Sequence, residues 1–504
     1  MIPSRESLLL GALALAAFGA SLTAPFHFDD WALFRDPAVT SASGWWQAWR
    51  PEQTRPLTWF TFWANYQAGG RNPIGYHGVN LLLHVAAALL LRDTLARLLP
   101  ARPALLAAAL FALHPIQTEP IVYVFARGTL LATLLSLASL GDWLRGRHWR
   151  AVAWFAAALA AKEECAAFPL VLLLLHVALS RSRAELPPIA AMLALALAAG
   201  IRAAWMTALA PGSGAGPQAG LGAWEYLATQ GVVVLRYFRL LLVPVGFTVD
   251  PDVAVVAGWR AWLAWGALLA AAAIALRGFR RAREGFWFLA GLLLLLPSSS
   301  VFPASDLAAD RRMYLPMVAF SAAAGLLLDR LDRRALAAGA VILVVLSFGR
   351  VLVWRSERAL WEEAARLAPR KVRPKIHLAR ALDLPDAARV LEEARQIAPD
   401  DAAVAAELGR VYFTRKRYPE ALAEFGRALA LSPNDSWALN NRGLALMALG
   451  QHQAARDDFR RALQWSPCLF DARFNLGQLG EKHAAPESCR FSDAQRRLLE
   501  GDDR

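Results

Sequence analysis

Long apolar segments separated by short polar ones fill the chain up to residue 353, and they constrain the fold more than any other feature. Of the 504 residues, 57% are hydrophobic and 19% are charged, a balance too apolar for a soluble protein of this length. A helix of about 20 apolar residues crosses a bilayer, so we expect an all-α polytopic membrane domain over residues 1–354. Its candidate spans are 7–24, 77–98, 103–116, 120–141, 149–162, 165–180, 187–209, 259–277, 285–302, 314–330 and 335–353.

Arginine clusters between the apolar segments indicate which connections face the cytoplasm, where positive charge is enriched. The clusters are Arg92/Arg97/Arg102, Arg145/Arg147/Arg150, Arg181/Arg183, Arg277/Arg280/Arg281/Arg283 and Arg330/Arg333/Arg334. With a cytoplasmic N-terminus, about eleven spans place all five clusters inside. The net charge of +13 therefore reports topology and not nucleic-acid binding. Only five of the 54 basic residues are Lys, and Ala is abundant, a composition typical of a GC-rich bacterium. Together with the expected spans, it predicts a protein of the bacterial inner membrane.

One further apolar stretch, residues 224–245, carries Arg236 and Arg239. A crossing here would reverse the side of the later clusters, so we interpret it as a re-entrant or interfacial helix on the outer side. The alternative is a true crossing combined with a misassigned span elsewhere. Our topology places the connections 25–76, 114–119, 162–164 and 297–313 outside, with the C-terminal domain in the periplasm.

Two spans are too short to cross a bilayer fully. Residues 104–113 give only ten apolar residues before His114, and residues 151–161 give eleven before Lys162. We expect both helices to end at these residues, so that their polar groups lie at membrane depth. Polar groups there must line a water-filled cavity or pair with one another, which predicts a polar site open to the outer side.

Three carboxylates are candidate catalytic groups. Asp29 and Asp30 follow the first span directly, and one of them is expected to act as a general base while the other orients the loop. Asp30 is our first choice for the base, because Asp29 is nearer the helix end and is better placed to cap or brace it. Ordinary solvation of a helix end is the alternative for this pair. Glu119 at membrane depth needs a cation, and Arg127 is the expected partner, in a pair that either serves the site or only braces helices.

Several polar side chains on the same side are candidate substrate-binding groups. Lys162 suits a phosphate, or it snorkels to the interface. Arg311 and Arg312 run against the positive-inside bias, and a phosphate or pyrophosphate would explain them; the alternative is pairing with Asp306, Asp310 or lipid phosphates. Arg55 is a further candidate of this kind, whereas His114 alone is expected to be structural. No metal-ligand spacing is evident.

A 34-residue period follows the membrane domain. Its positions recur as Leu408/Gly409, Tyr412, Ala421, Phe425, Ala428 and Pro433, then as Arg442/Gly443, Leu446, Ala455, Phe459, Ala462 and Pro467. This pattern predicts a tetratricopeptide-repeat α-solenoid over residues 355–482, with a tail at 483–504. Its concave face is expected to bind a peptide, or to pack onto the membrane domain. Because the periplasm is oxidising, Cys468 and Cys489 are expected to pair.

At these residues the chain resembles the membrane-and-tetratricopeptide-repeat O-mannosyltransferases, within the polytopic C-type (GT-C) glycosyltransferase superfamily. The resemblance rests on several short motifs and on the repeats, and it covers most of the chain. The motifs are Phe28-Asp29-Asp30 with Asp36-Pro37, Arg55-Pro56-Leu57-Thr58, Gly75-Tyr76-His77 with Asn80 and Leu83-His84, His114-Pro115-Ile116-Gln117-Thr118-Glu119, Arg127, Lys162-Glu163, and Asp310-Arg311 with Tyr314-Leu315-Pro316. The chain departs from the family at Gly128-Thr129, where an acid is usual, and it has only about three repeats.

The resemblance implies transfer of a sugar, in that family mannose, from a polyprenyl-phosphate carrier to an acceptor on the outer face, such as a protein Ser or Thr. It extends the candidate binding residues to His114, Arg127, Glu163 and Tyr314. The sugar, the acceptor (protein or glycan) and any divalent metal stay open. A non-enzymatic membrane scaffold and a lipid-linked glycan ligase or transporter are the competing classes. The polar groups gathered on the outer side favour the transferase.

Overall fold

The computed structural model describes residues 4–50, 53–179, 182–209, 215–279, 283–487, 489 and 491–500. Arg181, Arg280 and Arg281 of the predicted cytoplasmic clusters lie outside these residues. The chain divides into two compact units, residues 1–360 and residues 361–504. In the described part of the chain both units are helical and contain no β-strand beyond one isolated bridge.

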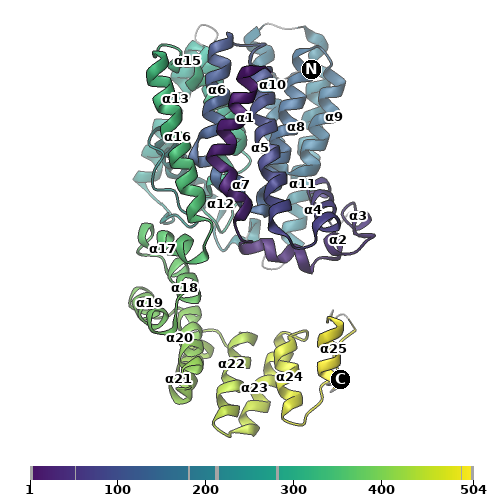
Figure 1. Cartoon of the computed structure of the whole chain (residues 1–504), viewed down its shortest axis with the longest axis vertical. Helices are drawn as coiled ribbons and strands as arrows, with labels where there is room; N and C mark the ends of the chain where they lie inside the picture. The colour runs from purple at the N-terminus through teal and green to yellow at the C-terminus, as the bar shows by residue number, and fades with distance from the viewer. Residues whose placement is uncertain are drawn as a thin grey trace. The chain divides into compact units, whose positions relative to one another are not determined.

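The first unit, which we call the membrane unit, is a bundle of helices (Figure 1). Every segment predicted to span the membrane is helical. These helices are α1 (Arg5–Phe18), α5 (Pro73–Leu95), α6 (Ala101–Leu113), α8 (Arg127–Leu144), α9 (His148–Ala161), α10 (Phe168–Leu179), α11 (Leu186–Leu209), α13 (Trp259–Gly278), α14 (Arg283–Leu295), α15 (Tyr314–Leu328) and α16 (Arg333–Val353). In space α8 packs on α5 and α9, and α15 packs on α6 and α14.

The helices differ in whether they are long and apolar enough to cross a bilayer. Six of those described are, and a seventh follows if α6 and the bent segment 115–122 count as one span. The expected number of about eleven is therefore not confirmed. The two predicted short helices do end where their apolar run ends, α6 at Leu113 and α9 at Ala161.

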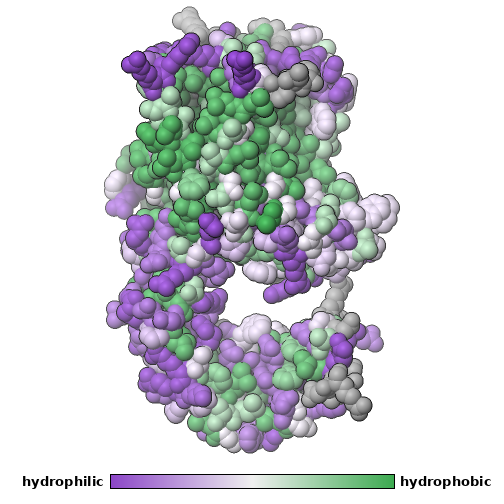
Figure 2. Space-filling model, in the orientation of Figure 1, coloured by the Kyte–Doolittle hydropathy of each residue, from purple (hydrophilic) through white to green (hydrophobic). Residues whose placement is uncertain are grey.

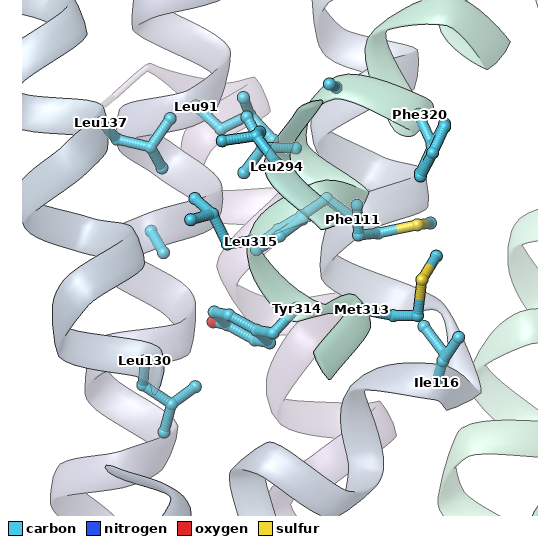
Figure 3. Packing of buried hydrophobic residues seen from close by; sticks show 14 of the residues in the cluster. Leu91, Phe111, Ile116, Leu130, Leu137, Leu294, Met313, Tyr314, Leu315 and Phe320 are labelled. Atoms are coloured by element: carbon cyan, nitrogen blue, oxygen red, sulfur yellow. The ribbon is translucent and has the colours of Figure 1, made fainter. Parts of the chain in front are cut away.

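The surface and the core of this unit are both apolar. Figure 2 shows hydrophobic residues covering the sides of the helices and hydrophilic residues at the two ends. Large apolar side chains on α5, α11, α13 and α16 are exposed, Trp262 by 75%, as expected of helices that face lipid tails. Inside, Tyr314 packs with Phe111, Leu315 and Met313 in a continuous cluster (Figure 3).

One end of the membrane unit gathers the connections predicted to lie outside, and we call it the loop end. It contains η2 (Phe28–Arg35), α2 (Pro37–Thr40), α3 (Gly44–Gln47), α4 (Pro56–Gly69), η3 (Pro115–Gln117), α7 (Thr118–Val122), η4 (Val124–Ala126), η5 (Glu163–Ala167) and η8 (Asp310–Met313). Contacts join η2 to η4, and η8 to both η3 and α7. Connections that are far apart in sequence therefore converge there.

The helix α12 (Ala223–Leu242) covers the residues predicted as re-entrant or interfacial. It is not among the six helices suited to cross a bilayer. Along its length it bonds to the connection before α15: Tyr226 to Ser298 O at 2.8 Å, Gln230 to Leu307 O at 3.0 Å and Tyr237 to Ala309 O at 3.0 Å. The helix also packs on α13, and Phe238 contacts Phe288 of α14 and Phe320 of α15, so the re-entrant or interfacial interpretation stays a prediction.

The first and last helices of the membrane unit are tied together. The helix α1 packs against α16. Beyond their ends, His27 Nε2 lies 2.7 Å from the carbonyl oxygen of Trp354, and the two rings meet edge to face. Both side chains are buried. The segment that carries Asp29 is thus held by the residue that follows the last predicted span.

The second unit, the repeat unit, is built from antiparallel helix pairs. Its helices are α17 (Glu357–Leu367), which begins in the membrane unit, α18 (Val372–Ala381), α19 (Leu384–Ile397), α20 (Ala402–Thr414), α21 (Tyr418–Leu431), α22 (Ser436–Ala448), α23 (His452–Trp465), α24 (Phe470–Gln478) and α25 (Asp493–Glu500). Each helix packs on its neighbours in the chain from α18 to α24. This is the arrangement of a solenoid.

The 34-residue period has a direct structural reason. A Cβ atom at Gly409 would come within 2.7 Å of the Phe425 ring, and one at Gly443 within 2.6 Å of the Phe459 ring. Only glycine therefore allows each helix pair to approach so closely. Asp401 and Asp435 cap equivalent helices by accepting bonds from backbone N–H groups. The repeat prediction is confirmed at these positions.

Candidate functional site

Asp30 anchors the loop that follows the first span. Its side chain has no exposed surface. Oδ2 accepts a bond from His27 N at 2.9 Å, and Oδ1 accepts one from Phe125 N at 2.7 Å. Burial raises the pKa of Asp30 to about 7, although these backbone donors oppose the shift. Because both oxygens bind backbone groups, Asp30 has little capacity left for a substrate.

Asp29, the neighbouring carboxylate, is exposed. Its Oδ2 accepts a hydrogen bond of 2.8 Å from the Tyr123 hydroxyl. The Tyr123 ring in turn lies 5.9 Å from the Arg311 guanidinium carbon. Our first choice of Asp30 for the base stays an untested prediction. The geometry favours Asp29 instead, because Asp30 braces the loop and Asp29 is the exposed carboxylate of the pair.

Glu119 binds Arg311 and not Arg127. Glu119 is 8% exposed, and it accepts bonds from Arg311 N at 3.1 Å and from Arg311 Nη1 at 2.5 Å. Asp306 lies 3.5 Å from Nη2 of the same arginine, whose side chain is 27% exposed. Arg311 thus stands between two carboxylates and keeps an accessible face.

The expected Glu119–Arg127 pair is absent because Arg127 is bound elsewhere. The arginine is fully buried, and its Nε donates to Asn80 Oδ1 at 2.8 Å. Nη1 and Nη2 donate to the carbonyl oxygens of Thr61 and Tyr76 at 3.2 and 3.1 Å. All of these partners are neutral, so Arg127 ties helices together, and its burial keeps it away from a ligand at the surface.

A second group of charges lies on α4 and η5. Arg55, just before α4, binds Glu163 with Nε 3.0 Å from Oε2. Lys162 is buried and donates to Thr129 Oγ1 at 2.7 Å and to Glu164 at 2.6 Å. Thr129, where the sequence departs from the resembled family, also donates to Glu164 Oε2 at 3.2 Å.

This group adjoins a cavity of about 520 Å³, a volume typical of ligand sites. Its polar lining includes Arg55, Glu163, Glu164 and Arg312. Its apolar lining includes Ala203 and Ala204 on α11 and, before η8, Leu296, Pro297, Phe302 and Pro303. Charged groups therefore stand beside an apolar wall, as a ligand with a charged head and an apolar tail would require.

Three of the expected binding residues have structural roles. His114 Nδ1 accepts a bond from Ile116 N at 3.1 Å and so caps η3. Arg312 Nη1 donates to Tyr226 Oη and to Leu307 O, each at 3.1 Å. Tyr314 is fully buried in the cluster of Figure 3, and its hydroxyl lies 2.9 Å from His84 Nδ1. Only Arg312 also lines the cavity.

Tyr123 was not identified from the sequence. The available signal was its place four residues after Glu119, in a segment already expected to line a site, but nothing in the sequence pointed the hydroxyl at Asp29. Among the residues that the structure describes, no three His, Cys, Asp or Glu side chains converge on a common point where a metal ion could bind.

The chain is similar to known proteins in two of its parts. Residues 409–450 match the family model "TPR repeat", and residues 436–467 match "Tetratricopeptide repeat". The chain is similar to the human protein O-mannosyl-transferase TMTC4, with 32% identity over 166 residues, or 27% of this chain and 22% of the relative. It is also similar to Tmtc1 of Drosophila melanogaster, with 41% identity over 99 residues, or 19% of this chain and 12% of the relative.

These relatives are protein O-mannosyl-transferases. The resemblance inferred from short motifs is thus confirmed at the level of curated relatives, over a part of the chain that spans about a fifth or less of their length. Human TMTC1 is similar as well, with 32% identity over 154 residues, covering 27% of this chain and 18% of the relative. Among solved structures, the crystal structure of MamA aligns with 30% of this chain and 83% of its own at 17% identity, with a TM-score of 0.23.

Proposed function

We propose that the membrane unit is a glycosyltransferase that moves a sugar, in keeping with its relatives a mannose, from a polyprenyl-phosphate carrier to a protein hydroxyl. The reaction would take place at the loop end, on the extracytoplasmic face of a bacterial inner membrane. The observation that carries this proposal is the exposed Asp29 carboxylate, held by Tyr123 beside the accessible face of Arg311.

Asp29 acts as the general base in this proposal. As the acceptor hydroxyl attacks the anomeric carbon, Asp29 takes its proton and the bond from that carbon to the phosphate oxygen breaks. The electron pair leaves with the carrier phosphate, so no soluble nucleotide is needed. Tyr123 fixes the orientation of the Asp29 carboxylate through their 2.8 Å hydrogen bond.

Cations near Asp29 stabilise the charge that develops on the phosphate. Arg311 is the first candidate, because its contact with Asp306 is long, at 3.5 Å, and a phosphate oxygen can replace that carboxylate. Arg55 is the second candidate, since it lines the cavity. The apolar wall of the cavity then accepts the first part of the prenyl chain.

The repeats present the protein acceptor or a partner in this scheme. Tetratricopeptide repeats stack into a concave surface that commonly binds peptides, and the relatives are named as transferases that act on proteins. A scaffold without enzymatic activity would not need the exposed Asp29 carboxylate beside Arg311, an arginine that already contacts Glu119 and Asp306.

The test is sugar transfer by the full chain in lipid nanodiscs, from radiolabelled polyprenyl-phosphate mannose to a Ser/Thr-rich peptide. Asp29→Asn should lower turnover by about 10²–10⁴-fold, the usual effect of removing a general base. Asp93→Asn is the matched control: this exposed carboxylate lies in the last turns of α5 and should leave turnover unchanged.

Thermal unfolding of each variant separates catalysis from folding. The proposal fails if the wild-type protein transfers no sugar from any polyprenyl-phosphate donor. It also fails if Asp29→Asn retains normal turnover, since the loop end would then not be the reaction centre.

A further inference from the structure

The C-terminal end of the repeat unit contains a second cavity, of about 710 Å³, which we call the cap pocket. It lies between α24, α25 and the segment that joins them. Its volume falls within the range of ligand sites in proteins. The side chains used below are Arg473, Phe474, Lys482, Glu487, Phe491 and Arg496. Nothing in the proposed transfer reaction uses this cavity.

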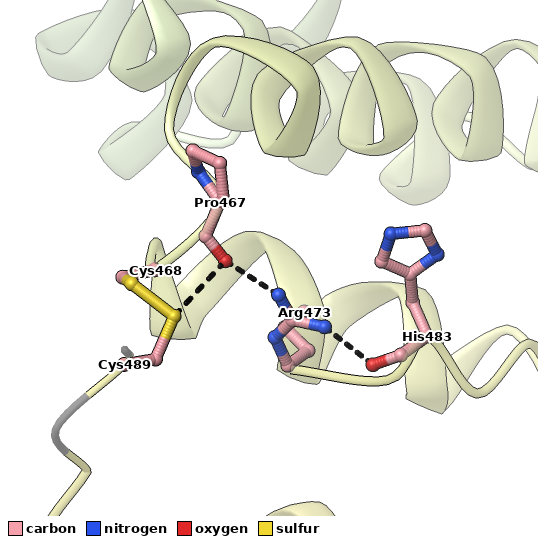
Figure 4. The surroundings of a disulfide bond; sticks show 5 residues. All are labelled: Pro467, Cys468, Arg473, His483 and Cys489. Carbon is pink, nitrogen blue, oxygen red and sulfur yellow. Dashed lines mark hydrogen bonds between the residues drawn. A yellow bond between two sulfur atoms is a disulfide. The ribbon is translucent and has the colours of Figure 1, made fainter. Parts of the chain in front are cut away.

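The walls of the cap pocket are fixed by Arg473 and by a disulfide. Arg473, which is 4% exposed, donates from Nη2 to Pro467 O at 2.5 Å and from Nη1 to His483 O. Cys468 and Cys489 form a disulfide, which confirms the pairing expected from the sequence. Figure 4 shows Arg473 and the disulfide residue Cys489 both bonded to the carbonyl oxygen of Pro467. His483 and Cys489, which follow α24, are therefore held in place.

The lining is cationic and apolar together. Arg473, Lys482 and Arg496 face it with positive charge, against the single carboxylate of Glu487. Phe474 and Phe491 supply aromatic surface, and Leu498 and Leu499 add aliphatic surface. In addition, Arg473 Nε is buried and has no hydrogen-bond partner among the described residues. A buried donor without an acceptor is unusual in a native protein.

We propose that the cap pocket binds an acidic segment of a partner protein, in which carboxylate side chains alternate with leucine-like ones. The carboxylates pair with Lys482 and Arg496 at the rim, and the apolar side chains lie against Phe474 and Phe491. A hollow of this size between helices accepts individual side chains, whereas a membrane surface requires a flat, exposed basic face. A peptide therefore fits this pocket better than an anionic bilayer.

The disulfide makes this site dependent on an oxidising compartment. Cys489 and Phe491 are two residues apart and both line the pocket, and the bond to Cys468 keeps Cys489 against the last repeat. When the disulfide is reduced, the segment loses its covalent tie and the pocket loses one wall. Binding should then fall while the helix pairs before α24 stay folded.

The experiment measures binding of two fluorescent peptides to the full chain in nanodiscs. One alternates Glu and Leu, and the other alternates Lys and Leu. The first should bind, with an affinity that falls as salt is raised, and the second should not. Lys482→Glu and Arg496→Glu should each weaken binding about tenfold, the value of one lost charged contact. Arg461→Glu, an exposed arginine of α23 outside the pocket, should change nothing.

Loss of the disulfide should weaken peptide binding at least tenfold. It can be removed by the double substitution Cys468→Ser/Cys489→Ser or by treating the wild-type protein with dithiothreitol. Unfolding temperatures measured alongside show whether each variant keeps its fold. Equal binding of both peptides overturns the proposal, as does an Arg496→Glu variant that binds normally. Binding of phosphatidylglycerol vesicles without binding of the Glu/Leu peptide would assign the pocket to lipid and would also overturn it. Sugar transfer to a small acceptor is a separate readout, so this result does not depend on the transferase proposal.

Discussion

Two groups of polar residues at the loop end have similar composition and opposite surroundings. Each contains an aspartate of the same loop and an arginine. In the closed cluster, Asp30 and Arg127 are fully buried and bind backbone or neutral side-chain atoms. In the open cluster, Asp29, Glu119, Asp306, Arg311 and Tyr123 bind one another and keep exposed surface on Asp29 and Arg311.

The nature of the partner separates the two roles. A backbone amide or carbonyl cannot leave its place unless the chain unfolds, so the closed cluster stabilises the fold. A carboxylate on a side chain can rotate away and give its place to a phosphate, so the open cluster can exchange partners with a ligand. Adjacent residues such as Asp29 and Asp30 can therefore serve different purposes.

The largest expected contrast concerns the two arginines. Arg127→Met should lower the free energy of unfolding by about 3–5 kcal/mol, because several buried acceptors lose their donor. Arg311→Met should cost about 1 kcal/mol, since Asp306 can reach water and Glu119 keeps the bond from the Arg311 backbone. Denaturant unfolding in nanodiscs measures both. Equal losses would remove the distinction between the clusters.

The next effect is a pH dependence that belongs to the closed cluster. Burial raises the pKa of Asp30 to about 7, above its value in an unfolded chain. The folded state therefore favours the protonated carboxyl, and this contribution is complete below about pH 4 and lost as the pH rises to about 7. Across that interval it amounts to on the order of 2–4 kcal/mol.

Asp30→Asn provides the measurement for that dependence. The difference in unfolding free energy between wild type and variant should shrink or change sign as the pH rises from 4 to about 7, and stay constant above. Taking the difference cancels the titration of other groups. A difference that is flat across this interval would mean that Asp30 is ionised throughout.

A smaller effect is expected at Tyr123. Tyr123→Phe removes the hydrogen bond to Asp29 and retains the ring. Turnover should fall about tenfold, the value of one hydrogen bond to a charged group, while the KM for the donor and the unfolding temperature stay near wild type. An unchanged kcat would show that Asp29 is oriented by other contacts.

The smallest effect is expected at Arg311. Arg311→Lys keeps the positive charge but loses the planar fork that suits phosphate oxygens. The KM for the donor should rise about threefold to tenfold, with little change in kcat. Arg312→Lys is the comparison, because Arg312 binds Tyr226 and Leu307 O; it should lower stability more than donor affinity.

The repeat unit could be predicted well from sequence because its information is local. The spacing of Gly409 and Gly443 matches that of Phe425 and Phe459, and each glycine contacts the phenylalanine of its own helix pair. Likewise, the ends of α6 and α9 follow directly from where their apolar runs stop. Contacts between residues that are close in the chain produce a regular pattern in the sequence, and this pattern predicts the structure.

The partners within the site could not be read in this way. Glu119 lies eight residues from Arg127 but 192 residues from Arg311, and the distant residue is its true partner. The burial that separates Asp30 from Asp29 likewise depends on η4 and on Phe125, from another part of the chain. The residue types in the sequence predicted that these groups lie near a site. Their partners could be assigned only from the packing of the helices.

The bond between His27 and Trp354 has a consequence for the order in which the protein is made. Asp29 lies in one of the first segments to leave the ribosome. The carbonyl that holds His27, two residues before Asp29, belongs to Trp354 at the end of α16. The loop that carries Asp29 can reach its final geometry only when the last predicted span has been inserted. A nascent chain that stops before residue 354 would carry the Asp29 carboxylate without this support. If Asp29 is the base that we propose, such a chain would be inactive while still in synthesis.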